Sequence, residues 1–536
     1  MPDAPSGASA LDFDYVIVGA GSAGCLLANR LSRKHRVLLL EAGGPDDWRW
    51  IHIPVGYLYC IGNPRTDWCY RTQADPGLNG RALGYPRGRV LGGSSSINGM
   101  LYLRGQAADY DGWAALGNTG WAWEDVLPLF MAVEDHHAGA SEFHGASGTW
   151  RVEQQRLRWK VLDAFRAAAG QAGIPGTDDF NRGDNFGCNY FEVNQRRGVR
   201  WNAAKAFLHP VMGRDHLKVM THAQVGRILF EGRRATGVEF THEGQRLQAR
   251  ARRELILAAG AIGSPQLLQV SGVGPGAHLQ ALGVPLVHDL PGVGENLQDH
   301  LQLRMIFRLQ GALTLNTLAN AWWGKAWMGL QYLLWRSGPL SMAPSQLGAF
   351  ARSDAAQPRP NLEYHVQPLS LDKFGDPLHR FPAMTASICN LQPESRGHVR
   401  ARTPEFSDAP EILCNYLSTT HDRAVAADAL RLTRTIMAQA AMAPYRPEEY
   451  LPGAAVQGQE ALEAAAGDIG TTIFHPVGTC KMGVDPQAVV DPQLRVHGLE
   501  GLRVIDASIM PRITSGNTNS PTIMIAEKGA RMILAA

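Results

Sequence analysis

The sequence predicts an α/β protein in which a Rossmann-like dinucleotide-binding domain is joined to a second, sheet-containing domain. A buried strand leads directly into Gly19, Gly21 and Gly24, and a second strand ends in Glu41. Farther along, residues 301–451 contain strand-like segments but no glycine motif. At 536 residues the chain exceeds the size at which one hydrophobic core stops growing, so two domains are expected.

Composition excludes several classes of protein. Hydrophobic residues make up 45% of the chain and charged residues 19%, which excludes both a disordered chain and a membrane-spanning bundle. The formal net charge is only +2 and there are no basic runs, so nucleic acid is not an expected partner. The seven cysteines lack zinc-like spacing, which argues against a structural metal and against a disulfide framework.

Reduced cysteines indicate a cytoplasmic protein. Residues 1–11 have no basic start followed by an apolar stretch, so we expect a short disordered leader rather than a signal peptide. No apolar run is long enough to span a bilayer. The expected location is therefore the cytoplasm, with peripheral contact at the inner face of the membrane as an alternative.

The first motif is the GxGxxG pattern from Gly19 to Gly24. Glycines at these positions allow a tight turn, backbone contact with a pyrophosphate, and close packing of a helix expected over 23–32. The second strand, expected over 36–40, places Glu41 where a carboxylate can accept hydrogen bonds from an adenosine ribose. This βαβ unit favours a dinucleotide site over a ligand-free turn, but it does not separate NAD from FAD.

A second glycine-rich segment covers 87–105 and includes adjacent glycines and three consecutive serines. Such residues let a loop lie flat against a planar ligand while offering amide and hydroxyl donors. The residue types alone are equally consistent with a tight loop that binds nothing.

Two long segments, 88–111 and 260–274, match the two signatures of the glucose-methanol-choline oxidoreductases. Residues 291–300, 475–480 and 504–527 also resemble this family, so the likeness spans nearly the whole chain. The resemblance implies an interleaved arrangement of an FAD-binding domain (11–147, 213–300 and 452–536) and a substrate-binding domain with an antiparallel sheet (148–212 and 301–451).

The same resemblance implies which residues bind FAD. They are Gly19, Gly21, Ser22, Ala23, Gly24, Glu41, Ala42, Arg89, Leu91, Gly92, Gly93, Ser94, Asn98, Gly99, Met100, Leu101, Val225, Ala259, Gly260, Asp506, Ala507, Asn519, Pro521 and Thr522. Some members attach the flavin covalently to a histidine where this chain has Ile97. Isoleucine cannot form that bond, so noncovalent FAD is expected, and no metal.

The resemblance also implies a catalytic pair, His475 and Asn519, with Phe474 beside them in the substrate pocket. Oxidation of an alcohol to an aldehyde moves a hydride to flavin N5 and a proton to a base, and histidine suits the role of base near neutral pH. Asn519 can orient the hydroxyl without titrating. Ser520 before Pro521 predicts a helix start at this point, with a positive end that stabilises reduced flavin.

Residues 320–336 form an apolar helix candidate with four tryptophans. A buried helix or an entrance lid is favoured here over a membrane-surface contact. The apolar candidate lid, and the lack of an assignable carboxylate for a trimethylammonium cage, favour a neutral primary alcohol over choline. The expected electron acceptor is a quinone or respiratory carrier. An oxidase that uses oxygen and a non-redox hydroxynitrile lyase are the alternatives.

Overall fold

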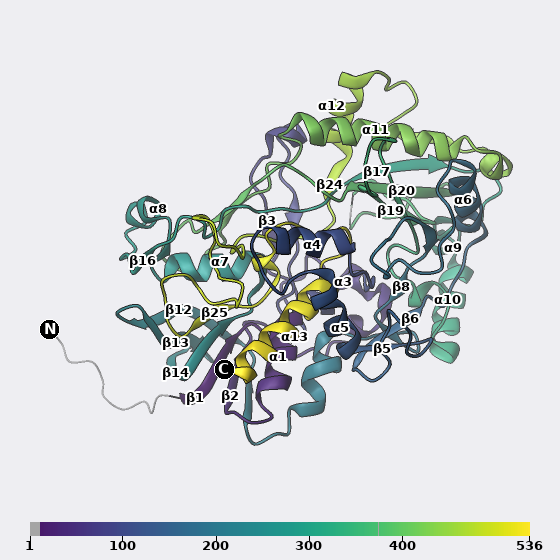
Figure 1. Cartoon of the computed structure of the whole chain (residues 1–536). Helices are drawn as coiled ribbons and strands as arrows, with labels where there is room; N and C mark the ends of the chain where they lie inside the picture. The colour runs from purple at the N-terminus through teal and green to yellow at the C-terminus, as the bar shows by residue number, and fades with distance from the viewer. Residues whose placement is uncertain (1–10, 374) are drawn as a thin grey trace.

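The computed structural model describes residues 11–373 and 375–536. Residues 1–10 of the expected leader lie outside the described residues, and its last residue, Leu11, begins a strand instead. The predicted class is confirmed, because the described chain forms two seven-stranded sheets with helices packed around them (Figure 1). The first sheet lies at the lower left of Figure 1 and the second at the upper right.

The first sheet has the strand order β11-β2-β1-β14-β13-β12, with β25 beside β14. These strands are β1 (Leu11–Val18), β2 (Val37–Leu40), β11 (Leu217–Met220), β12 (Ala223–Glu231), β13 (Arg234–His242), β14 (Gln245–Leu257) and β25 (Leu502–Val504). The pairs among β11, β2, β1, β14 and β25 are parallel, whereas β12 and β13 add antiparallel strands at one edge. The predicted βαβ unit lies in the parallel part, as β1, the helix that follows it, and β2.

Glycine sets the turn from β1 into α1 (Ser22–Leu31). Gly19 has a φ of +96°, and a Cβ on Gly24 would lie 1.9 Å from the Gly19 carbonyl oxygen. The helix therefore packs on the end of the strand at a distance that no side chain allows. β2 begins at Val37 and consists of four fully buried apolar residues, as a strand covered on both faces requires.

The second sheet is antiparallel, with the order β23-β17-β20-β19-β18-β7 and with β24 beside β17. Its strands are β7 (Gly187–Tyr190), β17 (Leu301–Arg308), β18 (Leu347–Ala351), β19 (Leu362–Gln367), β20 (Ala383–Asn390), β23 (Glu448–Leu451) and β24 (Gly470–Thr472). β19 and β20 coincide with two strand-like segments of the sequence, residues 360–368 and 383–391. β24 joins this sheet although it lies within 452–536, the segment assigned by resemblance to the FAD-binding domain.

The longer helices cover the two sheets. They include α4 (Ala107–Ala115), α5 (Trp123–Val133), α6 (Lys160–Gln171), α7 (Gly260–Val270), α11 (Thr420–Met437), α12 (Gln459–Ile469) and α13 (Asn519–Ala535). α13 packs against α1 beside the first sheet, whereas α11 contacts β20 and α6 beside the second (Figure 1). Each sheet has its own large cluster of buried apolar side chains.

The start of α13 corrects the helix start expected at Ser520. The helix begins at Asn519, its N-cap residue is Thr518, and no side chain caps it. Pro521 is therefore the third helical residue, where its missing N–H costs nothing because the first amides of a helix have no intrahelical acceptor.

The tryptophan-rich segment forms α9 (Leu315–Asn320) and α10 (Trp322–Trp335). The expectation of a buried helix is wrong, because Trp322 is 83% exposed and Trp323, Trp327 and Trp335 are each at least half exposed. Only one face of α10 is buried, through Gly324, Met328 and Tyr332. No helix among the described residues is long and apolar enough to cross a membrane.

Candidate active site

A cavity of about 1460 Å³ lies between the two sheets. Its walls include the ends of β1 and β2 and the first turns of α1, α7 and α13. On the other side it is lined by residues of β17 and β19 of the antiparallel sheet. The size and position of the cavity are those of a site for a dinucleotide and a small substrate.

Most of the residues predicted to bind FAD or substrate line this one cavity. They are Gly19, Gly21, Ser22, Ala23, Glu41, Ala42, Gly93, Ser94, Asn98, Gly99, Met100, Leu101, Val225, Ala259, Gly260, Phe474, His475, Asp506, Ala507, Asn519 and Thr522. Gly24, Arg89, Leu91, Gly92 and Pro521 do not line it. Gly24 lies behind the wall against Gly19, and Arg89 stacks on Trp68, with its guanidinium carbon 4.8 Å from the ring centroid.

The two glycine-rich loops pack on each other and form one wall. The Gly92 N–H donates to the Ala20 carbonyl at 2.8 Å, and a Cβ on Gly93 would lie 2.7 Å from the Gly21 Cα. Their glycines are therefore needed for the contact between the loops as well as for contact with a ligand.

At the dinucleotide end of the cavity, two glycines have open space at the position that a side chain would occupy. A Cβ on Gly21 would meet only the Ala258 carbonyl oxygen at 3.9 Å, and a Cβ on Gly260 would meet no atom within 4 Å. Gly21 is the N-cap of α1 and Gly260 begins α7, so backbone amides of two helix starts border this space. A pyrophosphate fits this environment because helix N-termini favour anions.

Glu41 lies at the adenosine end of the predicted site. Its carboxylate accepts hydrogen bonds from the backbone N–H groups of Ala20 and Gly43 at 2.9 and 2.8 Å. Burial raises the pKa of Glu41 to about 7, against the lowering effect of these two bonds. The bonds fix the carboxylate at the cavity wall, where it can accept from ribose hydroxyls.

Asn519 and Asp506 differ in how many of their side-chain polar atoms form hydrogen bonds. Asp506 accepts from Gly260 N, Ser264 Oγ and Ser508 N, which fixes the start of α7. Asn519 accepts from Ser22 Oγ at 2.6 Å, so the first turns of α13 and α1 are joined. Its buried Nδ2 has no hydrogen-bond partner among the described residues. That amide is a donor available to an FAD oxygen.

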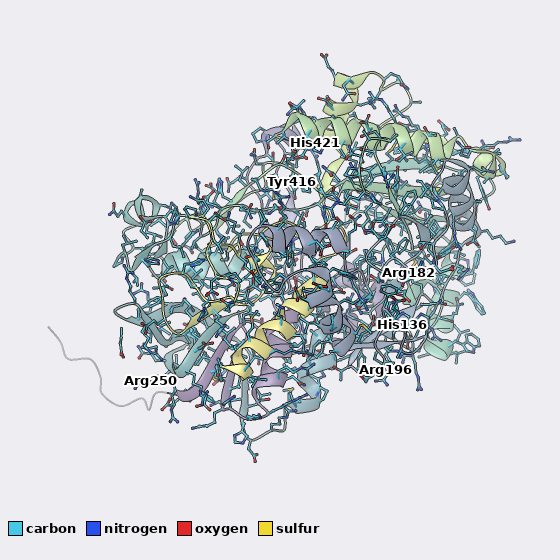
Figure 2. The ribbon with its side chains drawn as sticks, in the orientation of Figure 1. His136, Arg182, Arg196, Arg250, Tyr416 and His421 are labelled. Carbon is cyan, nitrogen blue, oxygen red and sulfur yellow. The ribbon has the colours of Figure 1, made fainter. Side chains whose placement is uncertain are left out.

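His475 is held from its backbone. The carboxylate of Asp299 accepts from His475 N at 2.7 Å, and also from the hydroxyls of Tyr85, Tyr416 and Thr472. Tyr416 is labelled in Figure 2. Phe474, the preceding residue, has a φ of 71°, which is costly for a bulky side chain. These anchors hold a strained turn that directs His475 into the cavity.

The His475 tautomer follows from its neighbour His300. His300 Nε2 lies 3.2 Å from the carbonyl oxygen of Leu391, so this nitrogen carries the proton and donates it. His300 Nδ1 is then an acceptor, and His475 Nδ1–H donates to it at 3.1 Å. The network assigns an unprotonated Nε2 to His475, which is the form that a general base requires.

The surroundings also keep His475 neutral. Burial, with the nearby His300, His365 and Arg87, holds its pKa well below the ordinary value of 6.5. Arg87 donates to the carbonyl of Phe474 at 2.6 Å, which places a positive charge close to the ring. At neutral pH, His475 is therefore ready to accept a proton.

The side chain that contacts His475 Nε2 is Asn517, at 2.9 Å through its Nδ2, and not the predicted Asn519. Sequence reasoning missed Asn517, although both asparagines stand in the same Gly516–Thr522 motif. Asn517 precedes α13, and its position is fixed by Ser515, whose N–H and hydroxyl both donate to Asp109. No signal in the sequence separates the two asparagines, because the helix start expected at Ser520 leaves both of them before the helix, whereas the structure starts α13 at Asn519.

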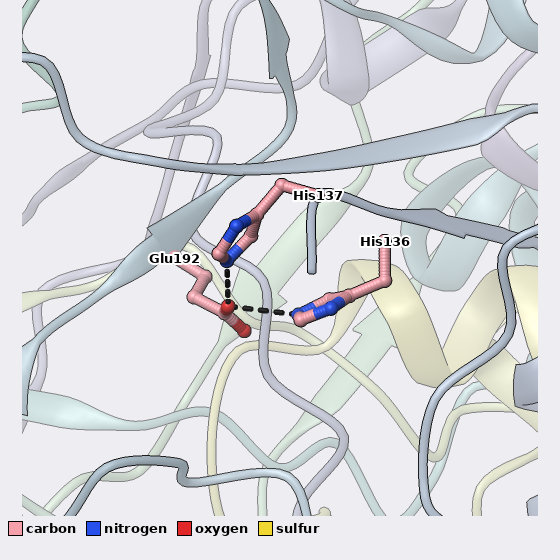
Figure 3. Close-up of side chains that lie close together, drawn as sticks. All are labelled: His136, His137 and Glu192. Atoms are coloured by element: carbon pink, nitrogen blue, oxygen red, sulfur yellow. Dashed lines mark hydrogen bonds and ion pairs between the residues drawn. The ribbon is translucent and has the colours of Figure 1, made fainter. Parts of the chain in front are cut away.

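Two clusters among the described residues have the residue types of a metal site. One is the buried set Glu363, His365 and Cys389, and the other is His136, His137 and Glu192 (Figure 3). Nε2 of His136 and of His137 lie 2.8 and 3.0 Å from the same Glu192 oxygen. The backbone N–H of Ala138 donates to His136 Nδ1, so Nε2 of His136 carries a proton. Hydrogen bonding to Glu192 thus accounts for this geometry without a metal.

Two protein-family models match most of the chain. The GMC oxidoreductase N-terminal model matches residues 13–302, and the C-terminal model matches residues 393–526. The chain belongs to the GMC oxidoreductase family. It is 42% identical to human mitochondrial choline dehydrogenase, over 97% of this chain and 90% of the relative. It is 43% identical to the oxygen-dependent choline dehydrogenase of Paraburkholderia xenovorans, over 98% and 95% of the two chains.

Solved structures agree with this assignment. Pyridoxine 4-oxidase from Mesorbium loti superposes with a TM-score of 0.89 at 34% identity and covers 98% of this chain and 99% of its own. Formate oxidase superposes with a TM-score of 0.91 at 25% identity, over 99% of both chains.

The family binds FAD and acts on alcohol-type substrates, so this member is an FAD-dependent oxidoreductase. The residues present fit that cofactor, since the open space at Gly21 and Gly260 and the unpaired Nδ2 of Asn519 face one cavity. Ile97 lines the same cavity and offers no nucleophile for covalent attachment.

Two glycines of the first motif should respond differently to a single methyl group. We expect Gly21→Ala to fold normally but to lose most of its FAD, because its Cβ has room in the protein but would occupy the pyrophosphate space. Gly24→Ala should lower stability by about 3 kcal/mol or more, because its Cβ would meet a backbone oxygen. Thermal unfolding of both apoproteins and the flavin absorbance per chain measure the two effects. Equal unfolding midpoints for the variants would contradict the distinction.

Proposed function

We propose that the protein oxidises a primary alcohol to the aldehyde, with His475 as the general base. The single observation that supports this most is the neutral His475 Nε2, oriented by His300 and facing the cavity beside Asn517. Noncovalently bound FAD supplies the hydride acceptor in this reaction. His475 Nε2 would take the hydroxyl proton of the alcohol as the carbinol carbon gives up its hydride to that acceptor, which would leave the aldehyde.

Asn517 is proposed as the partner of His475 in place of Asn519. The direct contact of 2.9 Å between the two side chains leaves no space for an oxygen atom, so a bound alcohol must part them. The hydroxyl then donates to His475 Nε2 and accepts from Asn517 Nδ2. Asn517 orients the oxygen and stabilises its developing negative charge without titrating. Asn519 is assigned to FAD binding.

The proposed electron acceptor is a quinone or respiratory carrier. The exposed α10 supports a membrane location for this transfer, because seven of its large apolar side chains are at least 45% exposed. No acidic residue lies in α10, while Lys325 lies within it and Arg336 follows it. An apolar surface with basic neighbours suits insertion at an anionic membrane surface.

Choline is a second candidate substrate. It is supported by the names of the relatives at 42% and 43% identity, and by the aromatic residues Tyr57, Trp68, Tyr70 and Phe474 on the cavity wall. Aromatic rings attract quaternary ammonium groups. Anaerobic bleaching of the flavin by a panel of alcohols, followed by addition of oxygen or quinone, separates these substrates and also an oxidase from a dehydrogenase. Cyanide release from a cyanohydrin without any bleaching would favour a lyase.

His475→Ala should reduce the anaerobic rate of flavin reduction by about 10²–10⁴-fold, the usual contribution of a general base. Because the pKa of His475 lies well below 6.5, kcat/KM of the unmodified enzyme should show no acidic limb at pH 6.5 or above and should fall only at lower pH. Stopped-flow reduction across pH tests both expectations. An activity that rises with an apparent pKa above 6.5 would show that another group is the base.

The two asparagines give a matched pair of variants. Asn517→Ala should lower the rate of flavin reduction by about 10²–10³-fold with normal flavin content, because it removes a donor to the reacting oxygen. Asn519→Ala should mainly lower the affinity for FAD. Flavin content after dialysis and the reduction rate of fully loaded enzyme separate the two roles. The opposite pattern would restore Asn519 as the catalytic partner.

Removal of α10 tryptophans should release the protein from membranes. We expect vesicles of phosphatidylcholine and phosphatidylglycerol to bind the enzyme, and Trp322→Ser, Trp323→Ser and Trp327→Ser each to weaken binding by about tenfold through lost apolar burial. Val484→Ser, at another exposed apolar residue, is the control and should bind normally. Failure of the unmodified protein to cosediment with these vesicles at low salt would contradict the membrane role.

A further inference from the structure

The substrate side of the cavity is lined by one face of β17. Gln302, Arg304 and Ile306 line the cavity, whereas the alternating residues Leu303 and Met305 are 3% and 0% exposed within the core of the second domain. Since successive side chains of a strand point to opposite faces, the Arg304 side chain lies on the cavity face between two uncharged neighbours.

Arg304 is half-buried and has no ion-pair partner in the parts of the chain that the structure describes. Two other arginines on the cavity wall donate hydrogen bonds to backbone carbonyls of the protein. Arg81 donates to the carbonyls of Gly467 and Gly470, and Arg87 donates to those of Pro86 and Phe474. Arg304 is therefore a cation that the described protein does not neutralise.

The carboxylates on the cavity wall do not offset this charge. Asp67 accepts from the backbone N–H groups of Gly62, Cys69 and Arg87, and Glu41 and Asp506 are bonded at the dinucleotide end. Asp372, Asp376 and Asp468 are exposed to solvent. Behind the wall, the buried Asp299 accepts from His475 and three hydroxyls, and the buried Glu363 lies 3.2 Å from His365. Among the described residues, the substrate side therefore has no lining carboxylate that pairs with Arg304.

Burial of a cation without a partner is unfavourable, and a bound anion removes that penalty. Burial lowers the pKa of Arg304 from its ordinary value, and burial raises that of Tyr57, an effect that the nearby Arg304 opposes. A guanidinium remains charged under these conditions, and its planar set of donors matches a carboxylate or phosphate through two hydrogen bonds.

The strand also fixes the approximate distance from the base. β17 begins directly after His300, and Leu301 pairs with Thr472 in β24, three residues before His475. Arg304 lies four residues beyond His300, whose ring contacts His475, and this separation along a strand corresponds to about 13 Å. A ligand that spans from His475 toward Arg304 therefore has several carbons between its hydroxyl and its anionic group.

We propose that the substrate is a primary alcohol bearing a carboxylate several carbons from the hydroxyl, and that Arg304 binds this carboxylate. The inference rests on the proposed oxidation of a primary alcohol. It replaces the neutral alcohol favoured by the sequence, and it disfavours choline, whose ammonium group would lie in the field of an unpaired guanidinium.

The test is anaerobic flavin reduction of the FAD-loaded enzyme by matched alcohols: ω-hydroxycarboxylates of about four to eight carbons, the corresponding alkanols and diols, ω-hydroxyalkyl phosphates and choline. We expect kcat/KM for the best hydroxycarboxylate to exceed that of its neutral analogue by about 10–100-fold. Arg304→Gln should abolish this preference mainly through KM, while the rate with neutral alcohols stays within about twofold. Arg304→Lys should retain part of the preference.

Arg71→Gln is the matched control, because Arg71 also lines the cavity but is exposed to solvent, and it should keep the preference. Bound flavin and the unfolding midpoint verify that each variant is folded.

If neutral alcohols or choline are preferred, or if Arg304→Gln leaves the preference unchanged, the anionic substrate is wrong while alcohol oxidation stands. A preference for the phosphates would overturn the carboxylate. If no alcohol of any charge bleaches the flavin, the proposed function itself fails.

Discussion

The buried carboxylate of Asp299 is the constraint on which the reactive part of the cavity depends. One oxygen accepts from the backbone of His475, and the other accepts from three hydroxyls that belong to Tyr85, Tyr416 and Thr472. Asp299 directly precedes His300 and β17, so the same few residues support the turn at His475, the tautomer of its ring and the start of the substrate sheet. The backbone of Phe474 keeps its unfavourable positive φ because these contacts hold the residues around it in place.

A second buried carboxylate, that of Asp109, anchors the loop that carries Asn517. Asp109 accepts from the N–H and the hydroxyl of Ser515, two residues before Asn517, and it also pairs with Arg359. The loop before α13 is thereby fixed to α4, while Ser22 ties the first turn of α13 to α1. His475 and Asn517 meet at 2.9 Å because two separately anchored loops converge, although 42 residues separate them in the chain.

Burial has two consequences on the two sides of this cavity. Near the base, it holds the pKa of His475 low, which keeps a neutral nitrogen available for the proton of an alcohol. On the β17 wall, it leaves the half-buried Arg304 without an ion-pair partner among the described residues, which would make an anionic ligand group favourable there. The same burial would therefore serve both the proposed proton abstraction and the proposed selection of the substrate by charge.

The sequence by itself determined the α/β class and the first glycine turn, because glycine spacing and buried strands are local patterns with local physical causes. Its resemblance to the GMC family, and not local pattern, named the residues expected to bind FAD, most of which line one cavity. The sequence also located β19 and β20. Only the tertiary structure decided that α10 exposes its tryptophans, that α13 starts at Asn519, and that Asn517 contacts His475. Burial of a helix face and contacts between loops depend on packing across the chain, which neighbouring residues do not encode. The tertiary structure likewise decided that Arg304 has no ion-pair partner in the described parts of the chain, since pairing depends on which side chains the fold brings together.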